Sequence, residues 1–521
     1  MTRHWHEKLD SRGNLWLGLD YADGPVNLLA REVLDELDIL VMGIEQTAPT
    51  ALIIHSLKDK GFIAGADVGE FVGAGDAKAV AERIRRVHGI LDRLEALPCP
   101  TLALIQGFCL GGGLELSLAC RYRVASDEPD TLLGLPEVRL GLFPGYGGTW
   151  RSIRTLGALP AMQLMLTGRS LRPKEARRLG LVDRVVPRRQ LEATALDLLQ
   201  KQPAPRRSAL TQRLLNHWPL RPLTAGLLER RTAERVKRDH YPAPFALIDH
   251  WRHNGANRRA LLVSEAKRVA QLLTGNRAQN LIRVFRLQER LKGLGRRAGF
   301  VPRRVHLVGA GVMGGDIAAW CALRGQHVTL QDLSQDQLAR AMKRAHSLFE
   351  RRLRDPRRVR DAWDRLIPDP RGEGLARADL VIEAIVEDVD AKRGLLADIE
   401  ARVDGDTLLA TNTSSIRLEA LEQGMKRPQR LVGLHFFNPV ARMQLVEVVH
   451  GRSTGAEALN KGLSFVRAID RLPLPVRSSP GFLVNRVLMP YLLEAMHLLE
   501  EGVPAPAIDR AAEDFGMPMG P

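Results

Sequence analysis

Hydrophobic positions in the first 190 residues form short apolar runs separated by longer amphipathic stretches. The short runs predict strands at residues 15–19, 51–56 and 101–105, and the stretches between them have helical spacing. Alternation of strands and helices is typical of layered α/β domains. We therefore expect residues 1–190 to form one α/β domain.

Residues 191–300 have a different pattern. They are rich in Leu, Arg and Ala at helical spacing, with a break at residues 241–244 (YPAP). Residues 281–294 predict one amphipathic helix. This segment is expected to be a helical linker between two domains.

Strand–helix alternation returns after residue 303. It predicts strands at 304–308 and 327–331 with a helix at 315–323 between them. From residue 480 the pattern is helical again, with helices expected at 485–499 and 507–515. The predicted fold is α/β, with a third domain at 301–478 and the start of a C-terminal α-helical domain at 479–521.

Composition narrows the possible partners. The net charge of +16 is compatible with nucleic-acid binding, with a phosphate-bearing substrate or cofactor, or with solvated basic faces. Aromatic residues make up only 5%, too few for base-stacking platforms, so we expect no nucleic-acid partner. No apolar run approaches the roughly 20 residues of a transmembrane segment, and four scattered cysteines indicate a reducing, cytoplasmic location.

Two segments that follow predicted strands end in small residues. They are residues 60–67 (KGFIAGAD) and 108–115 (FCLGGGLE). Small residues let a ligand approach backbone N–H groups closely, and two such groups aimed at one oxygen form an oxyanion hole. Either segment alone is also compatible with a tight turn.

Two carboxylates accompany these segments: Glu115 beside the glycine triplet, and Glu137 in residues 134–148 (GLPEVRLGLFPGYGG). The combined pattern resembles the enoyl-CoA hydratase/isomerase (crotonase) family, which has a ββα-type fold. The resemblance implies that the N–H groups of Ala66 and Gly112 hold a thioester oxygen and that Glu115 and Glu137 are an acid–base pair. The interval between the glutamates is two residues longer than the family pattern, so we expect residues 127–130 (DEPD) to bulge at the surface.

A second glycine-rich motif, Gly309, Gly311 and Gly314 in a G-x-G-x-x-G spacing, follows the strand predicted at 304–308 and opens a helix. Asp332 ends the next strand, 18 residues past Gly314. This context is typical of a Rossmann-type dinucleotide site, in which the acid binds the ribose 2′-hydroxyl. An acid repels a 2′-phosphate, and no basic residue follows it at once, so the predicted cofactor is NAD.

Four ordered polar motifs follow, at residues 411–415 (TNTSS), 435–439 (HFFNP), 446–449 (VEVV) and 479–486 (SPGFLVNR). With the glycine motif they resemble 3-hydroxyacyl-CoA dehydrogenases. The resemblance implies that His435 is the base, oriented by Glu447, and that Ser414 and Asn485 surround the substrate oxygen. It also places near the cofactor Met313, Ile385, Val386, Glu387, Lys392, Ser414 and Asn438. No metal site is predicted.

Hydratase followed by dehydrogenase on one chain resembles the α-subunits of fatty-acid β-oxidation multienzyme complexes. This resemblance implies acyl-CoA thioester substrates, a thiolase (acetyl-CoA acyltransferase) partner subunit and an oligomer. The alternatives are a bifunctional acyl-CoA enzyme outside a thiolase complex, or a basic binding scaffold with relic active sites. Acyl chain length and isomerase activity stay open.

The end of the sequence carries one more expectation. The resemblance to 3-hydroxyacyl-CoA dehydrogenases implies that further helices follow the segment that corresponds to residues 515–521 (FGMPMGP). We therefore expect a truncated form that keeps hydratase activity and binds NAD but has a weak dehydrogenase step.

Overall fold

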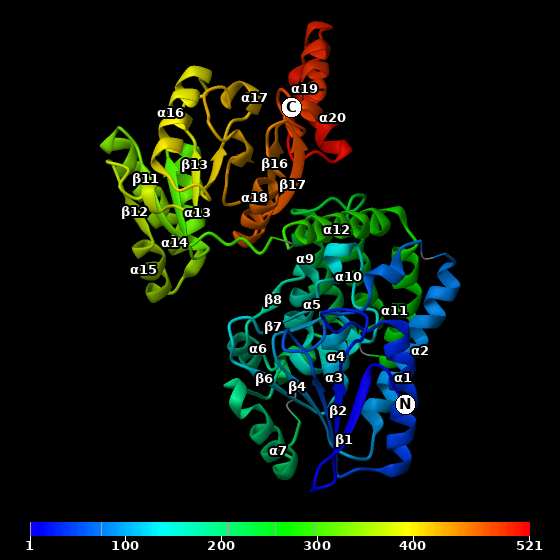
Figure 1. The fold of residues 1–521 in the computed structure, drawn as a ribbon. Coiled ribbons are helices and arrows are strands. Elements are labelled where there is room, and N and C mark those ends of the chain that lie inside the picture. The colour runs from blue at the N-terminus through cyan, green and yellow to red at the C-terminus, as the bar shows by residue number, and fades with distance from the viewer. Residues whose placement is uncertain (1, 74, 206–207, 256, 297) are drawn as a thin grey trace. The chain divides into compact units, whose positions relative to one another are not determined.

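The computed structural model describes the whole chain except residues 1, 74, 206–207, 256 and 297. It divides into two compact units, Met1–Phe285 and Arg286–Pro521 (Figure 1). Each unit has its own sheet and its own hydrophobic core.

The first unit is built on a six-stranded sheet in the order β1-β2-β3-β4-β6-β9. Only the β1–β2 pair is antiparallel. The strands are β1 Trp5–Leu9, β2 Asn14–Leu19, β3 Ala51–Ser56, β4 Thr101–Ile105, β6 Tyr122–Ser126 and β9 Arg184–Val186. The three strands predicted in this region correspond to β2, β3 and β4.

Strand β4 shows why these apolar runs form central strands. Side chains alternate between the two faces of a sheet, and both faces of β4 are covered. Leu102 and Leu104 pack with helix α7 (Leu191–Lys201), whereas Ala103 and Ile105 enter the main core of the unit. A strand buried on both faces needs a continuous apolar run, and the sequence supplies one.

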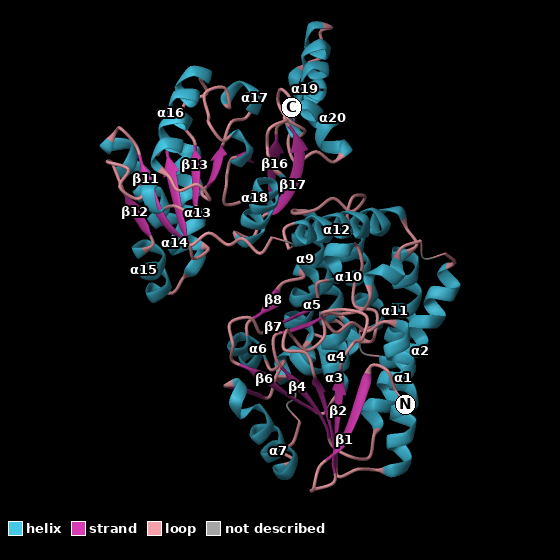
Figure 2. Ribbon diagram, viewed as in Figure 1, coloured by secondary structure: helices cyan, strands magenta, loops and turns pink. Residues whose placement is uncertain are grey.

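A small three-stranded sheet and a layer of helices complete this unit (Figure 2). The small sheet consists of β5 Phe108–Leu110, β7 Leu132–Gly134 and β8 Ser170–Leu171. The helices preceding α7 are α1 Arg31–Thr47, α2 Ala77–Ala96, α3 Gly112–Ala119, α4 Gly148–Leu156, α5 Ala158–Thr167 and α6 Pro173–Leu179.

The segment expected as a linker contributes helices to this unit. They include α8 Leu210–Leu214, α9 Leu220–Ala233, α10 Pro242–Asn254 and α11 Arg258–Leu273, and α11 packs along α2. The predicted break at 241–244 is a helix start, because proline is favourable in the first turn of α10. Helix α12 (Asn276–Leu294) begins earlier than the predicted residue 281. The domain boundaries given above stay predictions.

The second unit contains an eight-stranded sheet in the order β12-β11-β10-β13-β14-β15-β16-β17. Neighbouring strands are parallel except at the β15–β16 pair. The strands are β10 Arg304–Val308, β11 His327–Gln331, β12 Leu366–Pro368, β13 Leu380–Glu383, β14 Leu408–Thr411, β15 Leu431–Phe436, β16 Leu445–His450 and β17 Leu472–Arg477.

Helices connect the parallel strands of this unit (Figure 2). They are α13 Val312–Leu323, α14 Gln335–Leu353, α15 Pro356–Asp364, α16 Val389–Arg402, α17 Leu418–Leu421 and α18 Ala456–Ala468, followed by α19 Val484–Glu500 and α20 Ala505–Phe515. Strands β10 and β11 have the predicted bounds, and α13 starts three residues before the predicted 315 because the glycine turn leads directly into it.

Candidate active sites

A cavity of about 360 Å³ in the first unit is lined by all four residues predicted for the hydratase site, Ala66, Gly112, Glu115 and Glu137. Apolar side chains of α2 and α11 line it as well. They include Val80, Ile84, Val87, Val269 and Leu273. The cavity therefore combines two carboxylates with apolar walls.

Two glycine turns bring the predicted oxyanion residues together. Gly65 has a φ of 120° and Gly111 a φ of 50°, values that favour glycine, and each directly precedes a predicted N–H donor. A Cβ atom on Gly65 would lie 4.0 Å from the Gly112 nitrogen, so the turns are adjacent. A parallel bridge between Ile63 and Cys109 fixes the two segments side by side.

Glu115 is held from one side by backbone amides. Its Oε1 accepts hydrogen bonds from the N–H groups of Tyr146, at 2.7 Å, and Gly148, at 2.8 Å. The residue lies in the first turn of α3 and is 2% exposed. With Oε1 held in this way, Oε2 is the oxygen available to a ligand.

Burial sets the protonation of both glutamates. Desolvation raises the pKa of Glu115 well above its ordinary value, and the nearby carboxylates of Glu137 and Glu265 add to this, although the two amides oppose it. Burial likewise raises the pKa of Glu137 to about 8. Two carboxyl groups in one desolvated cavity cannot both ionise at low cost, so the pair retains a proton near neutral pH.

The sequence predicts a surface bulge at residues 127–130, between the two glutamates. Residues 127–130 form a turn between β6 and β7, with Asp127, Pro129 and Asp130 exposed. This turn is exposed and Glu137 lines the cavity, whereas the insertion itself stays a prediction.

The glycine motif of the second unit forms a tight turn between β10 and α13. A Cβ atom on Gly314 would lie 1.9 Å from the carbonyl oxygen of Gly309, and one on Gly309 would lie 2.5 Å from that of Ala384. At Gly311 no described atom lies within 4 Å of a Cβ position, so the space beside this residue is open. An open cradle at a helix N-terminus fits a pyrophosphate.

Asp332 follows β11 and lies against this turn. Its Oδ2 accepts the N–H of Ala310 at 2.7 Å, and its Oδ1 accepts the N–H of Ser334 at 2.8 Å. Each carboxylate oxygen can accept a further hydrogen bond. Contact between Asp332 and a ribose hydroxyl stays a prediction.

Glu387 connects several predicted cofactor residues. Its Oε1 accepts the Ser414 N–H at 2.8 Å and the Thr413 hydroxyl at 2.6 Å. Lys392 is fully buried and donates to Glu383 at 2.7 Å, with its Nζ 3.6 Å from Glu387 Oε2. Lys392 thus lies behind Glu387, and a direct contact with a cofactor stays a prediction.

His435 and Glu447 form the centre of the predicted dehydrogenase site. They are directly paired across β15 and β16, with 2.7 Å between Nδ1 and Oε2. The other oxygen of Glu447 accepts the N–H groups of Leu483 and Val484 at the start of α19, both at 2.9 Å. Burial alone would raise the pKa of Glu447, but these three hydrogen bonds hold it below its ordinary value.

The remaining residues predicted for the dehydrogenase site are partly buried or exposed. Asn485 donates from Nδ2 to the backbone oxygen of Ser414, at 3.2 Å. Met313 and Ile385 are partly buried, whereas Val386 and Asn438 are exposed. Their contacts with a ligand stay predictions.

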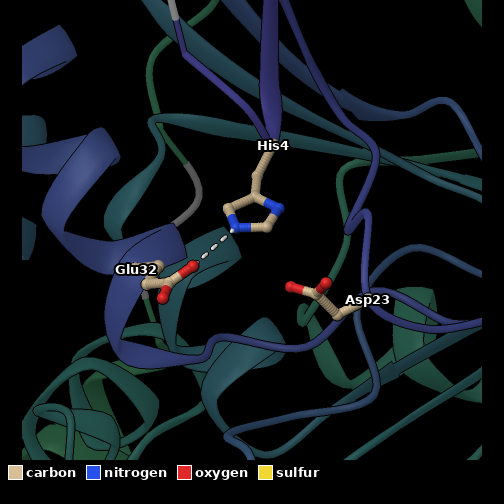
Figure 3. Close-up of side chains that lie close together, drawn as sticks. All are labelled: His4, Asp23 and Glu32. Carbon is tan, nitrogen blue, oxygen red and sulfur yellow. Dashed lines mark hydrogen bonds and ion pairs between the residues drawn. The ribbon is translucent and has the colours of Figure 1, made fainter.

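A separate group at the surface of the first unit consists of His4, Asp23 and Glu32, whose potential metal-binding atoms lie within 4.8 Å of one another (Figure 3). His4 Nδ1 accepts the N–H of Ala22, so the ring proton is on Nε2, which faces Glu32 at 3.4 Å. Arg3 forms ion pairs with both carboxylates. The His4 ring N–H and the Arg3 guanidinium already face these carboxylates, and we assign no metal to them.

Comparison with known proteins identifies one enzyme family in each half of the chain. Residues 22–231 match the family model described as enoyl-CoA hydratase/isomerase, and residues 304–479 match that of the 3-hydroxyacyl-CoA dehydrogenase NAD binding domain. Residues 481–521 match the C-terminal domain of the same dehydrogenases. The fatty acid oxidation complex subunit alpha of Vibrio vulnificus is 36% identical over 528 residues, which cover 99% of this chain and 74% of the relative.

The chain belongs to the family of fatty acid oxidation complex alpha subunits. The subunit alpha of Aliivibrio fischeri is also 36% identical, over 97% of this chain and 75% of that protein. A solved 3-hydroxybutyryl-CoA dehydrogenase from Escherichia coli is 41% identical, covering 42% of this chain and 48% of its own, with a TM-score of 0.41.

Membership of the alpha-subunit family confirms the predicted fold class, a crotonase-like domain combined with a Rossmann-type NAD-binding domain and a C-terminal helical domain. The chain is a bifunctional β-oxidation enzyme, an enoyl-CoA hydratase and an NAD-dependent 3-hydroxyacyl-CoA dehydrogenase. Among the described residues, no helix combines the length and the apolar character needed to span a membrane.

Sequence reasoning missed several residues of this alpha-subunit chain that support the sites. Glu383 ends an apolar strand, a signal that could have marked it, and it holds Lys392 and the Thr411 hydroxyl. Asn412, in the motif at residues 411–415, accepts the Phe436 N–H through its side-chain oxygen. For Glu265 the sequence offers only a weak indication of burial. It lies four residues from both Leu261 and Val269, on the buried face of α11.

Proposed function

We propose that Glu115 and Glu137 are the acid–base pair for hydration of 2-trans-enoyl-CoA, and that the N–H groups of Ala66 and Gly112 hold the thioester oxygen. The support is that all four line one cavity. Hydration needs a base to activate water, an acid to protonate C2 and donors for the charge on the thioester oxygen. A positioned acid or base contributes roughly 10²–10⁴-fold and an oxyanion donor roughly 10²–10³-fold.

The same pair can remove a proton from C2 and return one to C4. The proposal therefore includes 3-cis to 2-trans isomerisation of enoyl-CoA at this cavity. The raised pKa of both carboxyl groups supports it, because one group holds a proton while the other acts as a base.

In the dehydrogenase site we propose that His435 takes the proton of the 3-hydroxyl group. Its Nδ1 donates to Glu447, so Nε2 carries the lone pair that accepts this proton. The ionised Glu447 stabilises the imidazolium that results. Ser414 and Asn485, joined by a hydrogen bond, are proposed to contact the substrate oxygen, with Asn438 nearby.

When bound, NAD would supply the acceptor for the hydride that leaves C3. We propose that Gly309, Gly311, Met313 and Gly314 hold its pyrophosphate and that Asp332 binds the adenine-side ribose. Ile385, Val386, Glu387, Lys392 and Ser414 are proposed to line the nicotinamide side. The open space at Gly311 and the position of Asp332 beside the glycine turn support these assignments.

We further propose a thiolase subunit as partner, an oligomeric assembly and a cytoplasmic location. The names of the related alpha subunits support a complex, and four buried free cysteines suit a reducing compartment. An enzyme acting outside a thiolase complex is the alternative. Co-purification of the tagged chain with a co-expressed thiolase, sized by light scattering, distinguishes the two.

The direct test of the two activities is an assay with crotonyl-CoA and NAD. We expect loss of enoyl thioester absorbance in the ultraviolet, followed by formation of NADH. A basic scaffold with relic sites would give neither change.

A further inference from the structure

Glu265 is a buried carboxylate that none of the roles above uses. It lies on α11 with 0% of its surface exposed. Its Oε1 accepts the N–H of Gly147 at 2.6 Å and lies 3.1 Å from His88 Nε2. It is thus tied to the loop that precedes α4.

This loop, residues 145–148, is the one that holds Glu115. The N–H groups of Tyr146 and Gly148 bind Glu115, and the N–H group between them, on Gly147, binds Glu265. The two carboxylates therefore share three consecutive amides. Displacement of Gly147 would move both donors to Glu115.

Buried side chains also hold the carbonyl groups of this loop. His88 Nε2 lies 2.8 Å from the Gly145 oxygen, and Arg151 donates from Nη1 to the Tyr146 oxygen at 3.0 Å. Three of the four loop residues are glycine, and Gly147 has a φ of 86°. Because glycine restricts the backbone so little, these side chains determine the shape of the loop.

We propose, as an extension of the hydratase function above, that Glu265 is a positioning residue that fixes Glu115 through the amide of Gly147 and keeps the acid–base pair partly protonated by its charge. A glutamine could accept the same N–H, so hydrogen bonding alone does not explain a charged group here. A third buried acid beside two others carries a desolvation cost. His88, 3.1 Å away, offsets part of this cost, and we ascribe the remaining effect of the charge to the acid–base pair held by the same loop.

The charge of Glu265 acts on groups from several elements. It raises the pKa of both Glu115 and Glu137. Burial would raise its own pKa, but hydrogen bonds and the neighbouring histidines hold it below its ordinary value. The charged and titratable groups that face Glu265 or its loop are His88 on α2, Glu115 on α3, Glu137, Arg151 on α4 and His250 on α10.

The test compares Glu265→Gln with Glu265→Asp in the whole chain. Glu265→Gln keeps an acceptor for Gly147 but removes the charge, so the decline of hydratase rate at high pH should begin at least about half a pH unit lower. Glu265→Asp keeps the charge but is one methylene shorter. It should lower kcat about 10- to 100-fold through misplacement of the loop, with little change in KM or in the pH of the decline.

Glu234→Gln, at an exposed position after α9, is the matched control and should change neither quantity. Thermal unfolding of the same proteins, followed by circular dichroism, reports on folding, and if Glu265→Gln does not fold, Glu265→Asp still decides. Unchanged kcat in Glu265→Asp, or an unshifted profile in folded Glu265→Gln, overturns the proposal. Absence of hydratase activity in the unmodified chain would instead count against the proposed function itself.

Discussion

His435 and Glu447 face each other in one register pair of the antiparallel strands β15 and β16, with 2.7 Å between Nδ1 and Oε2. Glu447 is in turn fixed by two amides at the start of α19. The orientation of the imidazole ring thus depends on a strand pair and on a helix N-terminus.

Glu447→Gln should slow the dehydrogenase strongly. An amide can present an N–H to Nδ1 and favour the wrong tautomer, and it does not stabilise the imidazolium. We expect kcat for 3-hydroxybutyryl-CoA to fall roughly 10²–10⁴-fold relative to the unmodified chain. Steady-state NADH formation measures it, and an unchanged kcat in the folded variant would contradict the role assigned to Glu447.

Hydratase activity should decline as pH rises past about 8. The pKa of Glu137 is raised to about 8 by burial, so its carboxyl group is protonated below that pH and loses its proton above it. A reaction that needs one acid and one base then loses its acid. A pH–rate profile with crotonyl-CoA checks this, and a flat profile up to pH 10 would contradict the assignment.

Some elements and residues of the two sites could be predicted from the sequence, and others could not. The strands β3 and β4 could be predicted because apolar runs are required where both faces of a sheet are covered. The strands β10 and β11 could be predicted because β10 leads into the glycine motif and β11 ends just before Asp332. Glu115 could be predicted as a site residue because it lies just past the glycine triplet at residues 111–113 in the sequence. Glu265 could not be placed, because its role depends on α11 packing against α2, a contact between residues about 180 positions apart in sequence, as with His88 and Glu265.

Cofactor choice should follow Asp332. Its carboxylate suits a ribose hydroxyl and repels a 2′-phosphate. Asp332→Ser combined with Leu333→Arg should narrow the preference for NAD over NADP by about 10-fold or more. Leu333 is fully exposed, so the arginine can be accommodated. Equal kcat/KM with NAD and NADP in the unmodified dehydrogenase would contradict this assignment.

The preference of the hydratase for substrates of a given acyl chain length should depend on side chains of α11. Val269 lines the cavity and packs on Gly145, whereas Val263 on the same helix is exposed. Val269→Phe should lower kcat/KM for 2-decenoyl-CoA relative to crotonyl-CoA by about 10-fold, because it fills space needed by the longer chain. Val263→Phe is the control and should leave the ratio unchanged. A ratio unaffected by Val269→Phe would mean that long chains leave the cavity elsewhere.

The central claim is that two separate sites act in series on one chain, and a mixing experiment tests it most directly. Glu115→Gln and His435→Gln are each assayed for NADH formation from crotonyl-CoA, alone and as an equimolar mixture. Neither variant alone should form NADH above background, and the mixture should do so, because 3-hydroxybutyryl-CoA released by the His435→Gln protein is oxidised by the Glu115→Gln protein. NADH formation by Glu115→Gln alone, or no restoration in a mixture of folded variants, would contradict the account.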